Sequence, residues 1–207
     1  MHPLFQRHFA ACPLVTVLRG VTPDEVEAIS EAIFESGIRI IEVPLNSPEP
    51  LKSIEKLAKR MGDRALVGAG TVLDPGQVSE VRSAGGQLIV SPNTNPEVIA
   101  ATVAAGMVSC PGVFTPSEAF TALEAGAHAL KLFPAEAATP AYLKAQRAVL
   151  PRDVPILVVG GVKPELMGAW LEAGANGFGL GSGLFKPGNS AAQVLENARA
   201  YVAALAQ

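Results

Sequence analysis

The stretch Ala125-Gly126-Ala127-His128-Ala129-Leu130-Lys131-Leu132-Phe133-Pro134 contains the unit from which the chain is built. Its first pair, Ala125-Gly126, ends an amphipathic segment, and glycine suits the left-handed position that follows a helix. The apolar run 127–133 comes directly afterwards and is predicted to be a buried β-strand. The same small residue plus glycine recurs before other strand-like runs, at Ser36-Gly37, Ala84-Gly85, Ala105-Gly106 and Ala173-Gly174. The sequence therefore repeats a helix-to-strand step along its length.

Outward from this unit, strand-like runs alternate with helical patterns. The predicted strands are 14–19, 38–45, 65–70, 87–91, 107–110, 127–133, 155–159 and 177–180. A proline behind a capping residue predicts helix starts at Thr22-Pro23, Asn46-Ser47-Pro48-Glu49, Asp74-Pro75, Asn95-Pro96, Thr115-Pro116, Thr139-Pro140 and Lys163-Pro164. A last helix is expected over 190–205. This alternation is typical of an α/β fold with a parallel sheet.

Eight strands, each followed by a helix, predict a short (β/α)8 TIM barrel with an N-terminal helix, formed by one domain over residues 1–207. The alternative is an open doubly wound sheet, which usually has fewer strands and a GxGxxG motif after the first strand. Here the first strand runs into Leu18-Arg19-Gly20-Val21, which lacks that motif.

The composition limits the partners that the protein can have. A net charge of −3 argues against nucleic acid and against an anionic membrane, because both require a basic surface. No stretch is apolar enough for a signal segment or a membrane span. Cys12 and Cys110 belong to no CxxC motif and are predicted to be buried thiols in a reducing compartment. We therefore expect a cytoplasmic protein that binds small molecules.

Lys131 stands inside an apolar strand, which is an unusual place for an ammonium group. Burial favours the neutral amine, and a neutral lysine amine is a nucleophile that forms Schiff bases with carbonyl compounds. The alternative is a lysine whose stem lies on apolar surface while its head reaches water. The remaining polar residues bear on this choice.

Further polar side chains gather at the carboxyl ends of the predicted strands, where barrel enzymes carry their sites. Arg19 closes the first strand, and Glu42 lies within the second, before Asn46. If Glu42 points into the barrel, it forms a nucleophile and base pair with Lys131. The alternative is an outward carboxylate paired with a helix lysine. Thr71 follows the third strand, where it is either a site residue or only a helix cap.

Two glycine-rich turns follow the last two strands, at Val159-Gly160-Gly161-Val162 and Leu180-Gly181-Ser182-Gly183-Leu184. Consecutive backbone amides at a helix start can bind a phosphate without basic side chains. Phosphate sites after the seventh and eighth strands recur in this fold. Tight strand-to-helix connections explain the same glycines.

Eight ordered motifs resemble those of the pyruvate-forming class I aldolases of the 2-keto-3-deoxy-6-phosphogluconate (KDPG) and 4-hydroxy-2-oxoglutarate (KHG) family. The motifs are VLRGVTPDE, IEVPLNSP, VGAGTVL, SPNTN, CPGVFTPSEAFTALEAGA, LKLFPAEA, VVGGV and GLGSGLF, and they cover essentially the whole chain. The resemblance implies a lyase that needs neither a metal ion nor a cofactor and that forms a homotrimer. Its substrate would be a 2-keto-3-deoxy sugar-acid phosphate, and its products pyruvate and glyceraldehyde 3-phosphate.

The resemblance also implies a role for individual residues. Lys131 matches the Schiff-base lysine and Glu42 the general acid/base. The residues that match binding positions are Arg19 and Thr71 for the pyruvyl end, Pro92 and Phe133 for the pocket wall, and Gly161, Gly181 and Ser182 for the phosphate.

Two positions depart from the gluconate-type pattern and bear on the substrate. The place of Asn46 is commonly an arginine there, and the place of Val159 commonly a threonine. Valine cannot hydrogen-bond a substrate hydroxyl as threonine can, which favours the galactonate epimer. The gluconate epimer and 4-hydroxy-2-oxoglutarate stay open, as does a non-catalytic barrel in which Lys131 only binds the anion of a phosphosugar. Such a binder gains nothing from a carboxylate at Glu42, since that charge repels an anionic ligand.

Overall fold

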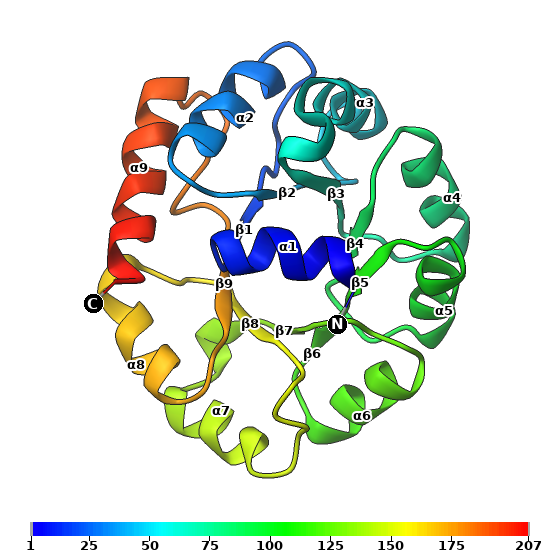
Figure 1. Ribbon diagram of the computed structural model, residues 1–207, viewed down its shortest axis with the longest axis vertical. Coiled ribbons are helices and arrows are strands. Elements are labelled where there is room, and N and C mark those ends of the chain that lie inside the picture. The colour runs from blue at the N-terminus through cyan, green and yellow to red at the C-terminus, as the bar shows by residue number, and fades with distance from the viewer. Residues whose placement is uncertain (1, 207) are drawn as a thin grey trace.

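The computed structural model describes residues 2–206 and contains one parallel sheet that curves into a barrel (Figure 1). Its strands are β1 Leu14–Val17, β2 Ile40–Pro44, β3 Leu66–Gly70, β4 Leu88–Val90, β5 Val108–Cys110, β6 Gly112–Val113, β7 Leu130–Leu132, β8 Ile156–Val159 and β9 Gly177–Leu180. Their order is β5-β4-β3-β2-β1-β9-β8-β7-β6. The TIM barrel predicted from the alternation is confirmed.

The two ends of this order meet at a single residue. Pro111 separates β5 from β6, so the fifth predicted strand continues beyond residue 110 in two pieces. Proline has no backbone N–H to give to a neighbouring strand. Its carbonyl still accepts a hydrogen bond of 2.9 Å from the amide of Lys131, and the amide of His128 donates to Ser109 at 2.9 Å. These bonds close the barrel beside β7.

The helices form a ring outside the strands (Figure 1). They are α1 Pro3–Ala11, α2 Val26–Glu35, α3 Pro50–Met61, α4 Pro75–Ser83, α5 Pro96–Ala104, α6 Pro116–Glu124, α7 Pro140–Arg147, α8 Met167–Glu172 and α9 Ala191–Ala204. Short 3₁₀ turns lie at η1 Gly62–Arg64, η2 Ala135–Ala137 and η3 Pro164–Leu166. The predicted caps Asp74, Asn95, Thr115 and Thr139 each accept a hydrogen bond from a first-turn amide.

Three predicted helix starts are displaced toward the carboxyl end. α2 begins at Val26 rather than behind Thr22, whose amide donates to the carboxylate of Glu25 at 2.9 Å. α3 begins at Pro50, because the residue before a proline avoids the helical conformation and Glu49 adopts φ 40°. Lys163-Pro164 opens η3, and α8 follows it.

Helix α1 covers the amino-terminal end of the barrel (Figure 1). Its Phe5 is fully buried, and Phe9 stacks on it with ring centroids 4.7 Å apart. Both rings join an apolar cluster with inward side chains of the strands, among them Val15 and Ile40. This end of the barrel is therefore filled by apolar groups, which leaves the carboxyl ends of the strands for polar ones.

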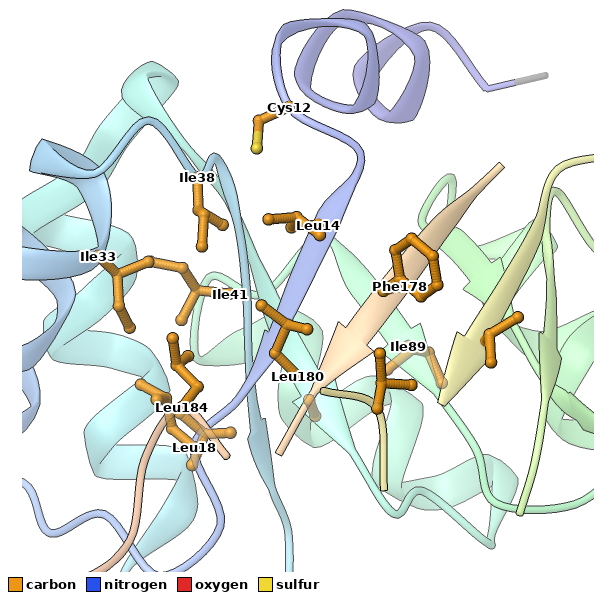
Figure 2. Packing of buried hydrophobic residues seen from close by; sticks show 14 of the residues in the cluster. Cys12, Leu14, Leu18, Ile33, Ile38, Ile41, Ile89, Phe178, Leu180 and Leu184 are labelled. Atoms are coloured by element: carbon orange, nitrogen blue, oxygen red, sulfur yellow. The ribbon is translucent and has the colours of Figure 1, made fainter. Parts of the chain in front are cut away.

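A second apolar cluster lies between the strands and the outer helices (Figure 2). It takes the alternate residue of each strand, such as Leu14, Ile41 and Phe178, and joins them to Ile33 of α2. Burial of one such side chain contributes roughly 1.5–3 kcal/mol. Because Ile41 faces outward, strand periodicity turns the next residue, Glu42, into the barrel.

Within the described chain, the model contains no helix of the length and apolar character that crossing a bilayer requires.

Candidate active site

Glu42 of β2 and Lys131 of β7 both lie inside the barrel. Their side chains are 1% and 7% exposed, and they line one small interior cavity together with Val17, Cys110 and other inward residues. The alternative of an outward Glu42 paired with a helix lysine is therefore wrong. The fold brings an acid and an amine that are far apart in the sequence into one apolar chamber.

Burial changes the proton affinity of both groups. It raises the pKa of Glu42 to about 7, against the opposing charges of Lys131 and Arg19. It lowers the pKa of Lys131, while the negative charge of Glu42 acts in the opposite direction. A carboxyl that titrates near neutrality can both accept and donate a proton. A lysine with a lowered pKa has more of the nucleophilic amine.

The Glu42 carboxylate is also open to a new partner. Its Oε2 is buried, and among residues 2–206 no hydrogen-bond donor reaches it. A buried polar atom without a partner is costly unless a ligand or water supplies one. The atom can therefore receive a proton from a hydroxyl brought into the cavity.

Gly70, at the end of β3, makes room for this carboxylate. A Cβ on Gly70 would lie 1.8 Å from Oε2 of Glu42 and 2.3 Å from its Cδ. We expect Gly70→Ala to displace the carboxylate and to lower turnover on the order of 10²-fold, as loss of a general base does. Gly168→Ala in α8 is the matched control, since a Cβ there has no heavy atom within 4 Å. Steady-state kinetics of both variants checks this, and an unimpaired Gly70→Ala enzyme would contradict it.

Arg19 is held over the mouth of the barrel by two loops. Its guanidinium donates to Oδ1 of Asn46 at 2.5 Å and to Oγ1 of Thr71 at 3.5 Å. Thr71 adopts φ 56°, and the cap of α4 is Asp74, so Thr71 is not the helix cap. A guanidinium held in this way presents a planar donor pair to a carboxylate.

Phe133 covers the amine from the side of β7. The Nζ of Lys131 lies 4.5 Å from the centroid of its ring. Pro92 follows β4, and its carbonyl packs so closely on Gly112 that a Cβ there would be 2.3 Å from the oxygen. Pro92 does not line the cavities around Lys131 within the described residues, so its role as a pocket wall stays a prediction.

A larger cavity, of about 320 Å³, runs from Lys131 to the two glycine-rich turns. The predicted residues in its wall are Arg19, Lys131, Phe133, Val159, Gly161, Gly181 and Ser182. Gly160 and Gly161 adopt φ 112° and 62°, which side chains rarely tolerate. Within residues 2–206, the amides of Gly161, Ser182 and Gly183 donate to no protein acceptor. The far end of the cavity can therefore bind an anion.

Sequence reasoning missed two charged residues of this wall, Glu136 and Lys186. Both follow strand ends: Glu136 lies in η2 after β7, and Lys186 lies beyond the turn after β9. The rule that located Arg19 at a carboxyl end would have found them if it had been extended past the first turn.

Other candidate side chains have structural partners. Burial raises the pKa of the Cys110 thiol to about 12, which disfavours a thiolate and agrees with packing. His128 accepts a hydrogen bond from the amide of Ser109 at 3.0 Å, and Trp170 belongs to the outer core. In the part of the chain that the structure describes, no three His, Cys, Asp or Glu side chains are placed to hold a metal ion.

Comparison with known proteins agrees with this geometry. Residues 6–197 match the family model described as "KDPG and KHG aldolase". The chain is 50% identical to the 2-dehydro-3-deoxy-6-phosphogalactonate aldolase of Escherichia coli K12, over 93% of this chain and 94% of that protein. It is 48% identical to a probable enzyme of the same name from Rhizobium meliloti 1021, over 93% and 91%.

Solved structures give the same result. The structure described as "Native KDPGal structure" superposes with a TM-score of 0.92 at 49% identity and covers 94% of both chains. KDPG aldolase from Legionella pneumophila, solved with pyruvate captured as a covalent carbinolamine, superposes with a TM-score of 0.83 at 31% identity, over 94% of this chain and 96% of that one. By the match of its sequence and of its fold, this chain belongs to the KDPG and KHG aldolase family.

Proposed function

We propose that this chain is a class I aldolase that cleaves 2-dehydro-3-deoxy-6-phosphogalactonate to pyruvate and D-glyceraldehyde 3-phosphate. The observation that carries the proposal is the buried pair of Lys131 and Glu42, whose pKa values both shift toward the neutral forms. Family membership and the likeness to galactonate-type relatives support the substrate.

The first step joins the substrate to Lys131. The neutral amine attacks the carbon-2 ketone and forms a carbinolamine, which loses water to give a protonated imine. Arg19 and Thr71 hold the neighbouring carboxylate, and this fixes carbon 2 beside Nζ. The imine nitrogen, now positive, can accept an electron pair from the carbon chain.

The second step breaks the bond between carbons 3 and 4. Glu42, directly or through a water, takes the proton of the carbon-4 hydroxyl while the bonding pair moves toward the imine and forms an enamine. Carbon 4 becomes the aldehyde of glyceraldehyde 3-phosphate, which leaves. Protonated Glu42 then returns a proton to carbon 3, and water hydrolyses the imine to pyruvate and free Lys131.

The phosphate end of the substrate reaches the two glycine-rich turns. The free amides of Gly161 and Ser182 would hydrogen-bond the phosphate oxygens. In this mechanism the electron sink and the proton carrier are both side chains, and we propose that the reaction is independent of metal ions and cofactors. A homotrimer is proposed from the family resemblance, and a cytoplasmic location stays a prediction from composition.

Borohydride trapping tests the proposal. The protein is reduced in the presence of pyruvate and EDTA, and intact and peptide masses are measured. We expect a stable adduct on Lys131, with EDTA making no difference. If no adduct forms while phosphate still binds, the aldolase proposal fails and the non-catalytic binding barrel is the better account.

The choice of epimer is a separate prediction. Val159 lines the cavity beside Lys131 and offers no hydrogen-bond donor to a carbon-4 hydroxyl. We expect kcat/KM for the galactonate epimer to exceed that for the gluconate epimer by about tenfold, with the ratio falling in Val159→Thr. Measurement of kcat/KM for both epimers and for 4-hydroxy-2-oxoglutarate decides this. A preference for either of the other two substrates would overturn the galactonate assignment but not the mechanism.

A further inference from the structure

The cavity wall contains an acidic side chain, Glu136, which the mechanism does not use. Glu136 lies in η2, a few residues beyond Lys131, and its carboxylate rests on the first glycine-rich turn. A Cβ on Gly160 would be 2.1 Å from its Oε2, and a Cβ on Gly161 would be 2.7 Å from its Cγ. The two glycines thus provide the space that this side chain occupies.

The charge of Glu136 is placed against the function of that turn. The turn exposes the free amide of Gly161, and the facing turn exposes those of Ser182 and Gly183. Such amides attract anions, whereas a carboxylate repels them. Glu136 takes part in none of the ion pairs found among residues 2–206, so no cation neutralises it at contact distance. Lys186 lines the same cavity and carries the opposite charge.

We propose that Glu136 is a specificity-determining residue that weakens the hold of the glycine-rich turns on the phosphate end of the ligand, with Lys186 acting in the opposite direction. The inference rests on the proposed function, because it assigns the anion site to a phosphorylated substrate and product. A cavity lined by free amides and Lys186 alone would retain a phosphorylated product longer. The carboxylate therefore balances capture of the substrate against release of glyceraldehyde 3-phosphate.

The test is a titration of the full-length protein with inorganic phosphate, followed through the amide NMR signals of Gly161 and Ser182. We expect Glu136→Gln to bind phosphate about 3- to 10-fold more tightly than the wild type, and Lys186→Gln to bind it more weakly by a similar factor. The difference between Glu136→Gln and the wild type should shrink as salt is added, because exposed charges are screened. Glu80→Gln on α4 is the matched control for loss of one exposed carboxylate.

Two outcomes would overturn the inference. If Glu136→Gln binds phosphate as the wild type does, or less tightly, the carboxylate is a packing group or a partner of a substrate hydroxyl. If phosphate shifts no signal in any variant, the turns are not an anion site.

These failures are distinguishable from failure of the proposed function. Trapping of pyruvate on wild-type Lys131 with no effect of Glu136 would leave the aldolase and remove this role. Tighter phosphate binding in Glu136→Gln without any trapping of pyruvate would leave the role and remove the aldolase.

Discussion

Replacement of Lys131 by methionine is expected to abolish the borohydride adduct with pyruvate and to lower kcat/KM on the order of 10⁴–10⁶-fold, the size of effect seen when a covalent nucleophile is removed. Methionine keeps most of the length and apolar volume of the lysine stem but cannot form an imine. Glu42 and the glycine-rich turns remain in place, so the cavity itself persists. Kinetics with each substrate, together with intact mass after reduction, measures the loss.

The same variant should fold at least as stably as the wild type. Lys131 is 7% exposed, and an ammonium group in such a place costs free energy that methionine does not. Without Lys131, the charge that lowers the pKa of Glu42 is gone, so Glu42 stays protonated to higher pH. Lys144→Met on the exposed face of α7 is the matched control and should keep full activity. Residual activity of Lys131→Met within tenfold of the wild type would rule out the imine mechanism.

Replacement of Glu42 by glutamine is expected to lower kcat by 10²–10⁴-fold, about the contribution of a positioned acid/base, while imine formation with pyruvate persists. The amide keeps the shape of the carboxyl but cannot carry the proton of the carbon-4 hydroxyl. The negative charge that raises the pKa of Lys131 is also removed, so trapping should extend to lower pH than in the wild type. Trapping rates and single-turnover cleavage separate the two steps. Equal loss of both steps would show that Glu42 acts before carbon–carbon cleavage.

Glu42 should also make stability depend on pH. Burial raises its pKa from 4.5 to about 7, so between these values the folded protein keeps a proton that the unfolded chain has lost. Its stabilising contribution is therefore complete below pH 4.5 and is lost as pH rises through 7, by about 3 kcal/mol in all. Glu42→Gln lacks this dependence. Urea unfolding at several pH values should show the variant gaining stability relative to the wild type from pH 4 to pH 8.

The sequence by itself determined the repeated local units. Proline behind Asp74, Asn95, Thr115 or Thr139 specifies a helix start from local chemistry alone, because the cap bonds an amide two or three residues away. The glycines behind the helices, such as Gly126 with φ 97°, are likewise local. Local rules failed where a second effect competed, as at Glu49 before Pro50, and where Pro111 splits a strand.

For the site, the sequence determined the residue types and their strand ends. An apolar run that contains Lys131, and another that contains Glu42, already point to groups whose solvation is unusual. Strand periodicity then leaves only two directions for each side chain, inward or outward. Nothing local chooses between these for a strand that is buried on both faces.

Only the tertiary structure decided that direction and its chemical consequences. Closure of the barrel brings β2 and β7 around one chamber, where the shared low dielectric raises the pKa of Glu42 and lowers that of Lys131. It also places Glu136 on the glycines of a turn that comes after a different strand. Such effects depend on distances between segments far apart in the chain, which residue types and spacing along the sequence do not specify.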